Sequence, residues 1–209
     1  MALALALLTT FEPARLESYA VDPVPWGTIA AGVVIFDVAV EADGVVGDVR
    51  VLQDVPPFTD LIRRKLPEWH FQPALEDGNP VDNRVLVVGV FRPAMLLFPA
   101  PSQPILPTPD PDSTIPFPTG LAIAPYPPNA IGDGEVMVEV SLDAEGKVQG
   151  ARMVGGTAAF QEAALDAARK WTFRPASRKG KSVPARAYLY FSFRQPVVGP
   201  SPPPGKKGR

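Results

Sequence analysis

The segment Trp171-Thr172-Phe173-Arg174-Pro175-Ala176 decides the fold of this chain, because a near copy, Trp69-His70-Phe71-Gln72-Pro73-Ala74, stands 102 positions earlier (171 − 69 = 102). The match extends without a gap from Gly32/Gly134 to Arg92/Arg194. Identical residues fall in register along it, namely Gly44/Gly146, Val46/Val148, Arg50/Arg152, Phe58/Phe160, Gly78/Gly180, Val81/Val183, Arg84/Arg186 and Phe91/Phe193. Because a fixed internal spacing indicates a repeated structural unit, the sequence predicts two copies of one module of roughly 60–70 residues.

Each copy has the residue pattern of a β-hairpin. In the second copy Val136, Val138 and Val140 alternate with other residues, which is the period of a strand. The run Asp143-Ala144-Glu145-Gly146 is a turn sequence whose glycine tolerates positive φ, and a second strand is expected at Lys147–Val154. With a helix and a last strand after it, this hairpin predicts an α+β fold of two tandem β-β-α-β modules. Each module is expected to form its own three-stranded antiparallel sheet with one main helix.

Apolar residues at helical spacing predict the helix of each copy. In the second copy one stripe runs from Phe160 to Trp171. In the first copy Pro67 cannot continue a regular helix, so a shorter or kinked helix is expected there. The last strand of the second copy, Val183–Arg194, is apolar on both faces. Its Tyr188/Tyr190 face must therefore be covered by the sister module, by the linker or by another chain.

Composition divides the chain into five parts. They are an apolar N-terminal segment at 1–20, a first and degenerate module at 24–93, a proline-rich linker at 94–124, a second module at 125–195 and a disordered tail at 196–209. The apolar run at 2–8 fits an imperfect export signal, with Ser18-Tyr19-Ala20 as cleavage residues, but it also fits a disordered or docked start. It is far shorter than the roughly 18 residues that a membrane helix needs.

Charge is distributed unevenly between the two copies. The whole chain carries a net charge of −2, which argues against a nucleic-acid partner. Residues 32–92 carry six Lys/Arg and ten Asp/Glu, whereas residues 134–194 carry ten and six, so the copies differ as −4 and +4 (6 − 10 and 10 − 6). Attraction between the copies, binding of an acidic partner by the basic copy, and drift on solvated faces all fit this difference.

The sequence offers little to an enzyme. It contains no cysteine, and its single histidine, His70, aligns with Thr172 among core aromatic residues, where a partly buried structural role is expected. Asp143 and Glu145 lie in a hairpin turn, where turn chemistry explains them. No phosphate loop, metal spacing or nucleophile motif is present. We therefore expect neither catalysis nor a cofactor or metal.

Together these segments resemble the C-terminal domain of TonB energy transducers. The resemblance rests on Tyr126-Pro127-Pro128, on Gly134–Val140, on the Asp-x-x-Gly hairpin and on the Trp-x-Phe-x-Pro segment, all at family spacing. The first copy resembles a degenerate version, with Val24-Pro25-Trp26 in place of Tyr-Pro-Pro. In that family the domain lies in the periplasm of Gram-negative bacteria and takes up the TonB-box peptide of outer-membrane receptors, which pairs as an added strand.

The resemblance implies a peptide site along the outer edge of the last strand, which is expected to be open. Physically this is β-augmentation, in which backbone groups supply affinity and alternate side chains supply selection. The basic second copy suits an acidic peptide, which Arg186 and Lys181 would meet. The implied site residues are Tyr126, Pro127, Val183, Ala185, Arg186, Ala187, Tyr188, Leu189 and Tyr190.

Two functions stay open at this point. A transducer has an N-terminal membrane helix that couples it to inner-membrane motor proteins, and no segment here is long enough. The first expectation is therefore a periplasmic TonB-like protein that binds a receptor peptide, with energy transduction only if a membrane helix lies upstream. The alternative is a structural or adaptor protein whose modules pair with each other, or homodimerise, through their sheet edges.

Overall fold

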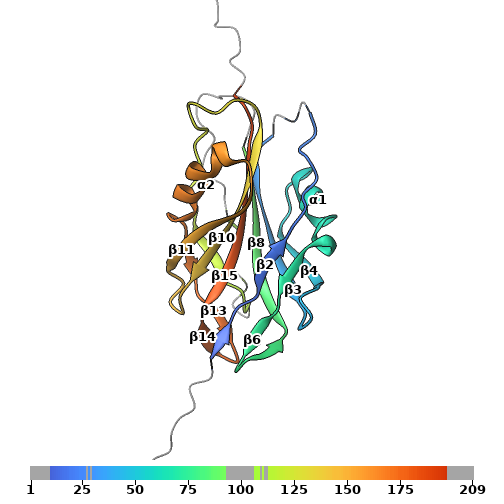
Figure 1. Cartoon of the computed structure of the whole chain (residues 1–209), viewed down its shortest axis with the longest axis vertical. Helices are drawn as coiled ribbons and strands as arrows, with labels where there is room; N and C mark the ends of the chain where they lie inside the picture. The colour runs from blue at the N-terminus through green and yellow to red at the C-terminus, as the bar shows by residue number, and fades with distance from the viewer. Residues whose placement is uncertain are drawn as a thin grey trace, which may run out of the picture.

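The computed structural model describes residues 10–26, 28, 30–92, 106–108, 110 and 113–196, and we call residues 10–92 the first half and residues 113–196 the second half. A six-stranded sheet stands in the middle of this part of the chain, with a short helix on each face (Figure 1). The strand order is β11-β10-β15-β8-β3-β4. The first half supplies β3 (Gly32–Val40), β4 (Val46–Gln53) and β8 (Asn83–Phe91), and the second half supplies β10 (Gly134–Leu142), β11 (Val148–Gly156) and β15 (Ala185–Phe193).

The fold is therefore mixed α/β, with many strands and two short helices among the described residues. Helix α1 (Phe58–Arg63) is followed by the 3-10 turn η1 (Leu66–Glu68), which contains Pro67, so the expected shortening of the first helix is confirmed. Helix α2 (Gln161–Ala168) is preceded by the 3-10 turn η2 (Ala158–Phe160). No helix in the described residues has both the length and the apolar character needed to cross a membrane.

Short strands complete each half. They are β1 (Phe11–Glu12), β2 (Arg15–Ser18), β5 (His70–Gln72), β6 (Ala74–Glu76) and β7 (Asn79–Val81) in the first half, and β9 (Phe117–Gly120), β12 (Thr172–Arg174), β13 (Ala176–Arg178) and β14 (Lys181–Val183) in the second. Strand β2 pairs with β5, and β9 pairs with β12, both antiparallel. The hairpins β6-β7 and β13-β14 lie together at the lower end of the molecule (Figure 1).

The Trp171–Ala176 segment contacts the hairpin turn at Gly146 and the backbone at Ala122. Gly146 has φ +81°, as expected for the turn, and a Cβ there would collide with the carbonyl oxygen of Phe173. Trp171 donates from Nε1 to the carbonyl oxygen of Ala122 at 2.9 Å. In the first half Trp69 makes the same bond to Ala20 at 2.7 Å, and Ala20 and Ala122 are again 102 positions apart (122 − 20 = 102).

Short strands also lie outside the expected bounds of the two modules. Residues 10–20 were assigned to a possible export segment and residues 113–124 to the linker, yet they carry β1, β2 and β9. Leu16 in β2 is only 3% exposed, so cleavage after Ser18-Tyr19-Ala20 would remove a residue of the core. The apolar run at 2–8, linker residues 94–105 and tail residues 197–209 lie outside the described residues.

The two predicted three-stranded sheets are not separate, which is the main correction to the expected fold. Strand β15 pairs in parallel with β8, from Ala187 opposite Leu86 to Ser192 opposite Phe91. Each last strand thereby satisfies the backbone groups that would otherwise form an open edge of its own small sheet. The expected strand Val183–Arg194 is also broken at Pro184, with β14 before it and β15 after it.

The parallel pairing brings two cores to opposite faces of one sheet. Paired residues are 101 positions apart, as in Leu189 opposite Val88 (189 − 88 = 101), whereas equivalent residues are 102 apart. Because a shift of one residue turns a side chain to the other face, equivalent residues of β8 and β15 face opposite sides. Val88 thus lies in the core under α2, and its equivalent Tyr190 lies in the core under α1.

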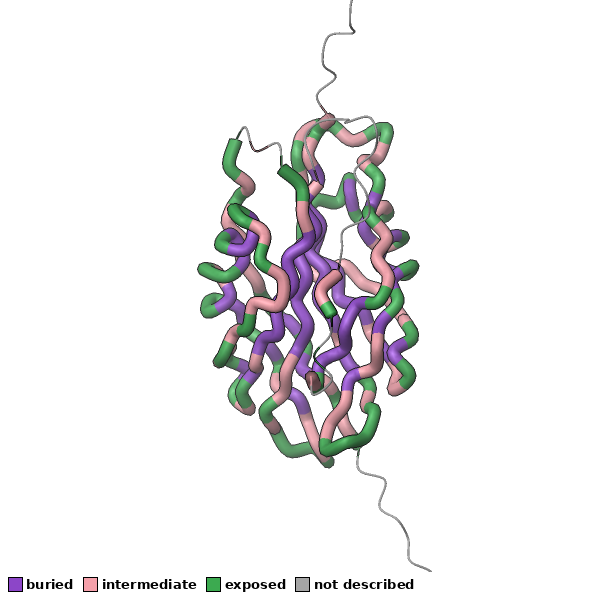
Figure 2. The backbone as a smooth tube through the Cα atoms, turned by 180° about the vertical axis from the view of Figure 1, so that it is seen from behind, coloured by how far each residue is buried: buried purple, intermediate pink, exposed green. Residues whose placement is uncertain are grey.

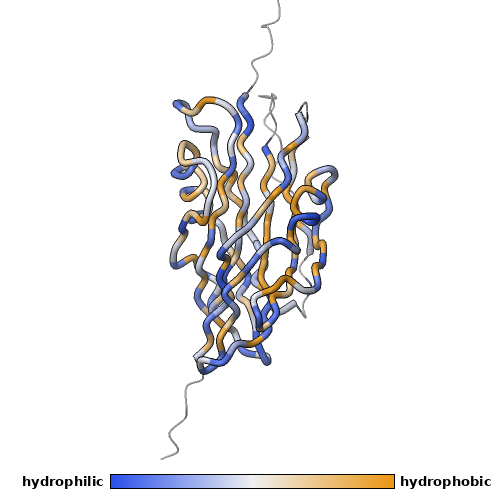
Figure 3. Tube along the Cα trace, turned by 45° about the vertical axis from the view of Figure 1, so that its right-hand side comes forward, coloured by the Kyte–Doolittle hydropathy of each residue, from blue (hydrophilic) through white to orange (hydrophobic). Residues whose placement is uncertain are grey.

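Each core is consequently built from both halves of the chain. The buried central strands form a continuous band through the molecule (Figure 2), and the same strands are hydrophobic while the turns at the lower end are hydrophilic (Figure 3). Ile35 and Val88 of the first half belong to the α2 core, and Tyr188 and Tyr190 of the second half belong to the α1 core. The sister half is therefore what covers the Tyr188/Tyr190 face.

Replacing Trp171 by phenylalanine should destabilise the protein by about 1–3 kcal/mol. The change leaves the part-buried carbonyl of Ala122 without its donor, and an unsatisfied buried acceptor costs that order of free energy. Urea unfolding followed by circular dichroism measures the loss. The matched control is Trp26→Phe, because Trp26 is 98% exposed and the change should stay within about 0.5 kcal/mol. Equal effects of the two substitutions would contradict the assigned role of Trp171.

Candidate peptide-binding strand

Strand β15 carries most of the residues that the resemblance implied for a peptide site, and it is not an edge. On one side it pairs with β10 along its whole length, and on the other side it pairs with β8 from Ala187 to Ser192. Ala187, Tyr188, Leu189 and Tyr190 are at most 1% exposed. The expectation of an open edge is therefore wrong for these four residues. A peptide can pair with them only where β8 has moved away.

The structure does not bring all the expected site residues together. Tyr126 packs edge-to-face against Phe160, with ring centroids 5.5 Å apart, and its hydroxyl donates to the carbonyl oxygen of Gly132 at 2.8 Å. Phe160 in turn stacks on Phe193, the last residue of β15. Tyr126 and the adjacent Pro127 therefore lie near the end of the strand. Val183 and Ala185 stand at its other end.

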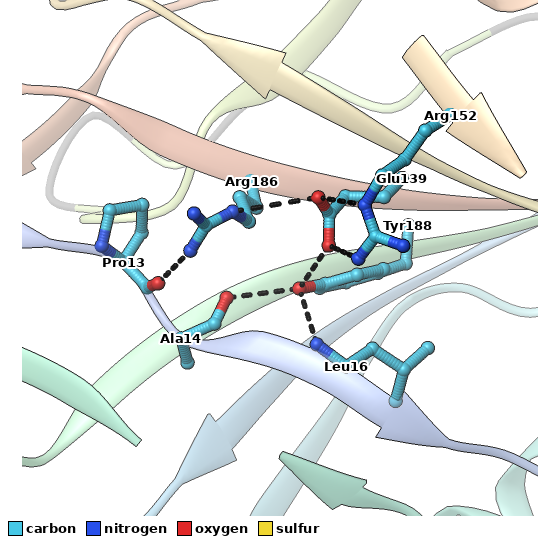
Figure 4. A network of polar contacts seen from close by, with 7 residues as sticks. All are labelled: Pro13, Ala14, Leu16, Glu139, Arg152, Arg186 and Tyr188. Atoms are coloured by element: carbon cyan, nitrogen blue, oxygen red, sulfur yellow. Dashed lines mark hydrogen bonds and ion pairs between the residues drawn. The ribbon is translucent and has the colours of Figure 1, made fainter. Parts of the chain in front are cut away.

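Tyr188 ties β15 to the N-terminal part of the chain (Figure 4). Its hydroxyl accepts the backbone N–H of Leu16 at 2.9 Å and donates to the carbonyl oxygen of Ala14 at 2.9 Å. Burial, with a smaller contribution from the nearby Glu139 carboxylate, raises the pKa of Tyr188, so the hydroxyl stays protonated and can donate. The side chain that was expected to face a peptide thus holds β2 against the sheet.

Glu139 is the centre of a buried ion cluster beside this tyrosine. Arg152 reaches it with two donors, Nε at 2.8 Å and Nη2 at 2.7 Å, and Arg186 Nε lies 3.6 Å away. Arg186 also donates to the carbonyl oxygen of Pro13 (Figure 4). Because bidentate arginine bonds satisfy a buried carboxylate, removal of either arginine bond would leave the Glu139 charge uncompensated inside the protein. Arg186 is therefore engaged inside the protein and does not stand free for an acidic peptide.

The first half has its own ion pair at the equivalent positions. Asp37 is 6% exposed and accepts from Arg84 Nε at 2.6 Å, and these residues are equivalent to Glu139 and Arg186 (139 − 37 = 102; 186 − 84 = 102). The side chain of Arg84 also lies 3.5 Å from Asp48. Each central carboxylate thus forms an ion pair with an arginine of the last strand in its own half, and Glu139 is bound more closely by Arg152 of β11.

A cleft of about 780 Å³ opens where β8 and β15 begin. The first residues of the two strands, Asn83–Val85 and Ala185–Arg186, pair only within their own halves. Both stretches contribute to the cleft lining, together with Pro184 and with Arg178 from the hairpin β13-β14. At the cleft, Ala185 and Arg186 therefore have no strand partner on the side of β15 that faces β8.

The single histidine and the carboxylate of the second hairpin turn both have contacts within the protein. His70 is exposed, and its Nδ1 lies 3.0 Å from the carbonyl oxygen of Glu68, so the expected partial burial is wrong. Asp143 accepts the backbone N–H groups of Glu145 and Lys147, which agrees with the expected turn chemistry. The bond from Lys147 is the main reason why the pKa of Asp143 is lowered. No group of three or more His, Cys, Asp or Glu side chains in this region is placed to hold a metal ion.

Comparison with known families gives a match within the second half of the chain. Residues 124–194 match the family described as the Gram-negative bacterial TonB protein C-terminal, and this range covers β10 to β15 with the cleft-lining residues Ala185 and Arg186. The match does not include the first half of the chain. The family is non-enzymatic and belongs to the envelope of Gram-negative bacteria. A search of curated proteins finds no match.

Replacing Tyr188 by phenylalanine should destabilise the protein by about 1–3 kcal/mol and loosen β2. The substitution keeps the ring but leaves the N–H of Leu16 and the carbonyl of Ala14 without the hydroxyl. Hydrogen exchange detected by mass spectrometry should show faster exchange in residues 14–18. The matched control is Tyr190→Phe, which loses a bond to the exposed Glu135 only. Unchanged exchange at residues 14–18 in Tyr188→Phe would contradict this role.

Proposed function

We propose that this chain is a non-enzymatic TonB-like binding protein of the Gram-negative envelope, linked to TonB-dependent transport. Two TonB C-terminal-like modules, the first degenerate, pair through their last strands to form one body. A peptide of an outer-membrane receptor, or of a related envelope partner, binds by pairing with β15. The observation that carries the proposal is the family match over residues 124–194, which contains the whole of β15.

Several observations support a common origin of the two modules. The spacing of 102 residues relates β3 to β10, β8 to β15, and the hairpin β6-β7 to β13-β14. It also relates two residues with positive φ, Asp77 at 53° and Lys179 at 51°. The stacked pair Phe58 and Phe91 has the same counterpart in Phe160 and Phe193. Agreement at this level of backbone detail favours duplication over chance similarity.

In the proposed mechanism the peptide takes the position of β8 on β15. Pairing of the peptide starts at the cleft, because Ala185 and Arg186 of β15 have no partner in β8 there. An extended peptide that pairs first with these residues can continue along β15 as β8 separates. Each backbone hydrogen bond that breaks between β15 and β8 is then replaced by a bond between β15 and the peptide. This stepwise exchange costs less free energy than separating β8 from β15 completely before the peptide binds.

The parallel pairing of β8 with β15 also favours the second candidate function. If β8 never leaves, the chain is a closed structural or adaptor protein whose two halves serve as each other's edge partners. Surfaces other than β15 would then contact the envelope partner. The two functions differ in whether the pairing of β8 opens when a peptide is present.

Loosening β8 should strengthen peptide binding if the peptide replaces β8. A Cβ at Gly89 would lie 2.6 Å from Ile62 Cδ1 and 2.8 Å from both Phe91 Cε2 and Val34 Cγ2. Gly89→Ala therefore overpacks the core that holds β8, which costs on the order of 1–3 kcal/mol. We expect it to raise the affinity for the peptide by about fivefold or more, because a larger fraction of molecules has β15 free.

Titration calorimetry with TonB-box peptides from the outer-membrane receptors of the same organism measures this effect. The control is Gly150→Ala in β11, where an added Cβ meets no atom within 4 Å and affinity should not change. Hydrogen exchange on the complex should rise in residues 86–91 and stay low in residues 187–192. Peptide binding without faster exchange in β8 would contradict the exchange mechanism, and the absence of binding by every peptide would favour the closed adaptor.

A further inference from the structure

The turns of the two equivalent hairpins meet at the lower end of the molecule and carry opposite charges. Lys179 Nζ lies 2.9 Å from Glu76 Oε1 and 3.1 Å from Glu76 Oε2, and Arg178 Nη2 lies 3.4 Å from Glu76 Oε2. The hydrogen bond from Lys179 is the main reason why the pKa of Glu76 is lowered. This contact joins the hairpin β6-β7 of the first half to the hairpin β13-β14 of the second.

The charged residues occupy equivalent positions in the two hairpins. Glu76 is equivalent to Arg178 and Asp77 to Lys179 (178 − 76 = 102; 179 − 77 = 102). Asp77 and Lys179 even share the same left-handed backbone, with φ of 53° and 51°. The turns therefore have one backbone shape and opposite charge, so the difference between them lies in the side chains.

Parallel pairing of the last strands explains why this difference matters. Because β8 and β15 run side by side in the same direction, the hairpins that precede them arrive at the same end of the sheet. Two identical halves from two chains, paired in the same way, would bring two acidic or two basic turns together. Like charges at that distance repel, whereas the pair within one chain attracts.

Arg178 also contacts uncharged groups of the first half, so the contact between the hairpins does not rest on charge alone. Its Nη1 donates to the carbonyl oxygen of Asp82 at 3.0 Å, and its guanidinium lies 5.1 Å from the ring centroid of Phe11. Asp82 and Phe11 both belong to the first half. The side chains of Arg178 and Glu76 are 24% and 23% exposed, so solvent screens their attraction only in part.

We propose that these opposite charges select the partner of each half: they direct β15 to β8 of the same chain and exclude pairing between identical halves of two chains. Glu76, Arg178 and Lys179 are the residues that determine this selection. The Lys179 ammonium is 73% exposed and acts mainly through its charge, while Arg178 adds directed hydrogen bonds. The selection does not depend on the proposed peptide binding.

Charge reversal in the full chain tests the proposal. Glu76→Lys with Asp77→Lys makes both turns basic, Arg178→Glu with Lys179→Glu makes both acidic, and all four changes together exchange the charges. Glu162→Lys with Asp166→Lys on the exposed side of α2 is the control for the both-basic variant, because it makes the same change in net charge away from the turns. Light scattering gives the mass, and hydrogen exchange of residues 187–192 reports the pairing of β15.

We expect the wild type, the control and the fourfold variant to be monomers with slow exchange. The both-basic and both-acidic variants should exchange roughly five to ten times faster in 50 mM NaCl, because attraction between the turns becomes repulsion. In 1 M NaCl the difference should shrink. When these two variants are unfolded, mixed and refolded together, a heterodimer should form, since each half then finds an opposite charge only on the other chain.

Two results would overturn the proposal. If the fourfold variant exchanges as fast as the both-basic and both-acidic variants, the side chains act through their shape and not through their charge. If the mixed variants refold as separate monomers, or if either one behaves as the control does, charge at these turns does not select the partner. Restored slow exchange in the fourfold variant, together with the heterodimer, supports the selection.

Discussion

The parallel pairing of β8 with β15 is the contact on which the rest of this structure depends. It joins two small antiparallel sheets into one and leaves β4 and β11 as the outer strands of the six-stranded sheet. Because the pairing is shifted by one residue from exact equivalence, each last strand presents its second apolar face to the helix of the other half. Neither core is complete without both halves.

The N-terminal segment of the first half depends on the same pairing. Ala14 and Leu16 are bound by the hydroxyl of Tyr188, which stands on a strand of the second half. Arg186 reaches Pro13 from the same strand. Separation of β8 from β15 would therefore loosen β2 as well as the sheet. If a peptide replaces β8, the contacts of Tyr188 with Ala14 and Leu16 should therefore weaken as well.

Patterns local in sequence predicted the parts of the fold that depend on local physics. The hairpin turn with positive φ at Gly146, and the shortened helix before Pro67, follow from backbone preferences of single residues. The pairing of β8 with β15 could not be predicted in this way. Strands pair through backbone N–H and C=O groups, so the side chains of one edge strand do not specify which strand pairs with it. Two signals pointed toward it: the apolar Tyr188/Tyr190 face and the opposite charges of the two copies.

The strands β2 and β9, which precede the hairpins β3-β4 and β10-β11, were not predicted, for a different reason. Leu16 stands between the charged residues Arg15 and Glu17, and Phe117 stands between Pro116 and Pro118, so composition indicated a leader and a linker. Ala20 and Ala122 are also 102 residues apart, but two alanines at that spacing are no signal on their own. Their equivalence becomes visible only in the structure, where Trp69 and Trp171 donate to their carbonyl groups. For the candidate site, the family resemblance implied the last strand of the second half, and that assignment stays a prediction. The resemblance could not show that β8 pairs along the edge of that strand.

Backbone NMR of the intact chain tests the central pairing most directly. A protein of 22.3 kDa is suitable for this measurement, and parallel pairing places backbone protons of Leu189 and Val88 close together. We predict cross-strand nuclear Overhauser effects between residues 86–91 and residues 187–192, with slow amide exchange in both strands. Absence of these effects, together with exchange of the β8 and β15 amides within minutes, would show that the halves do not share a sheet and would contradict this account.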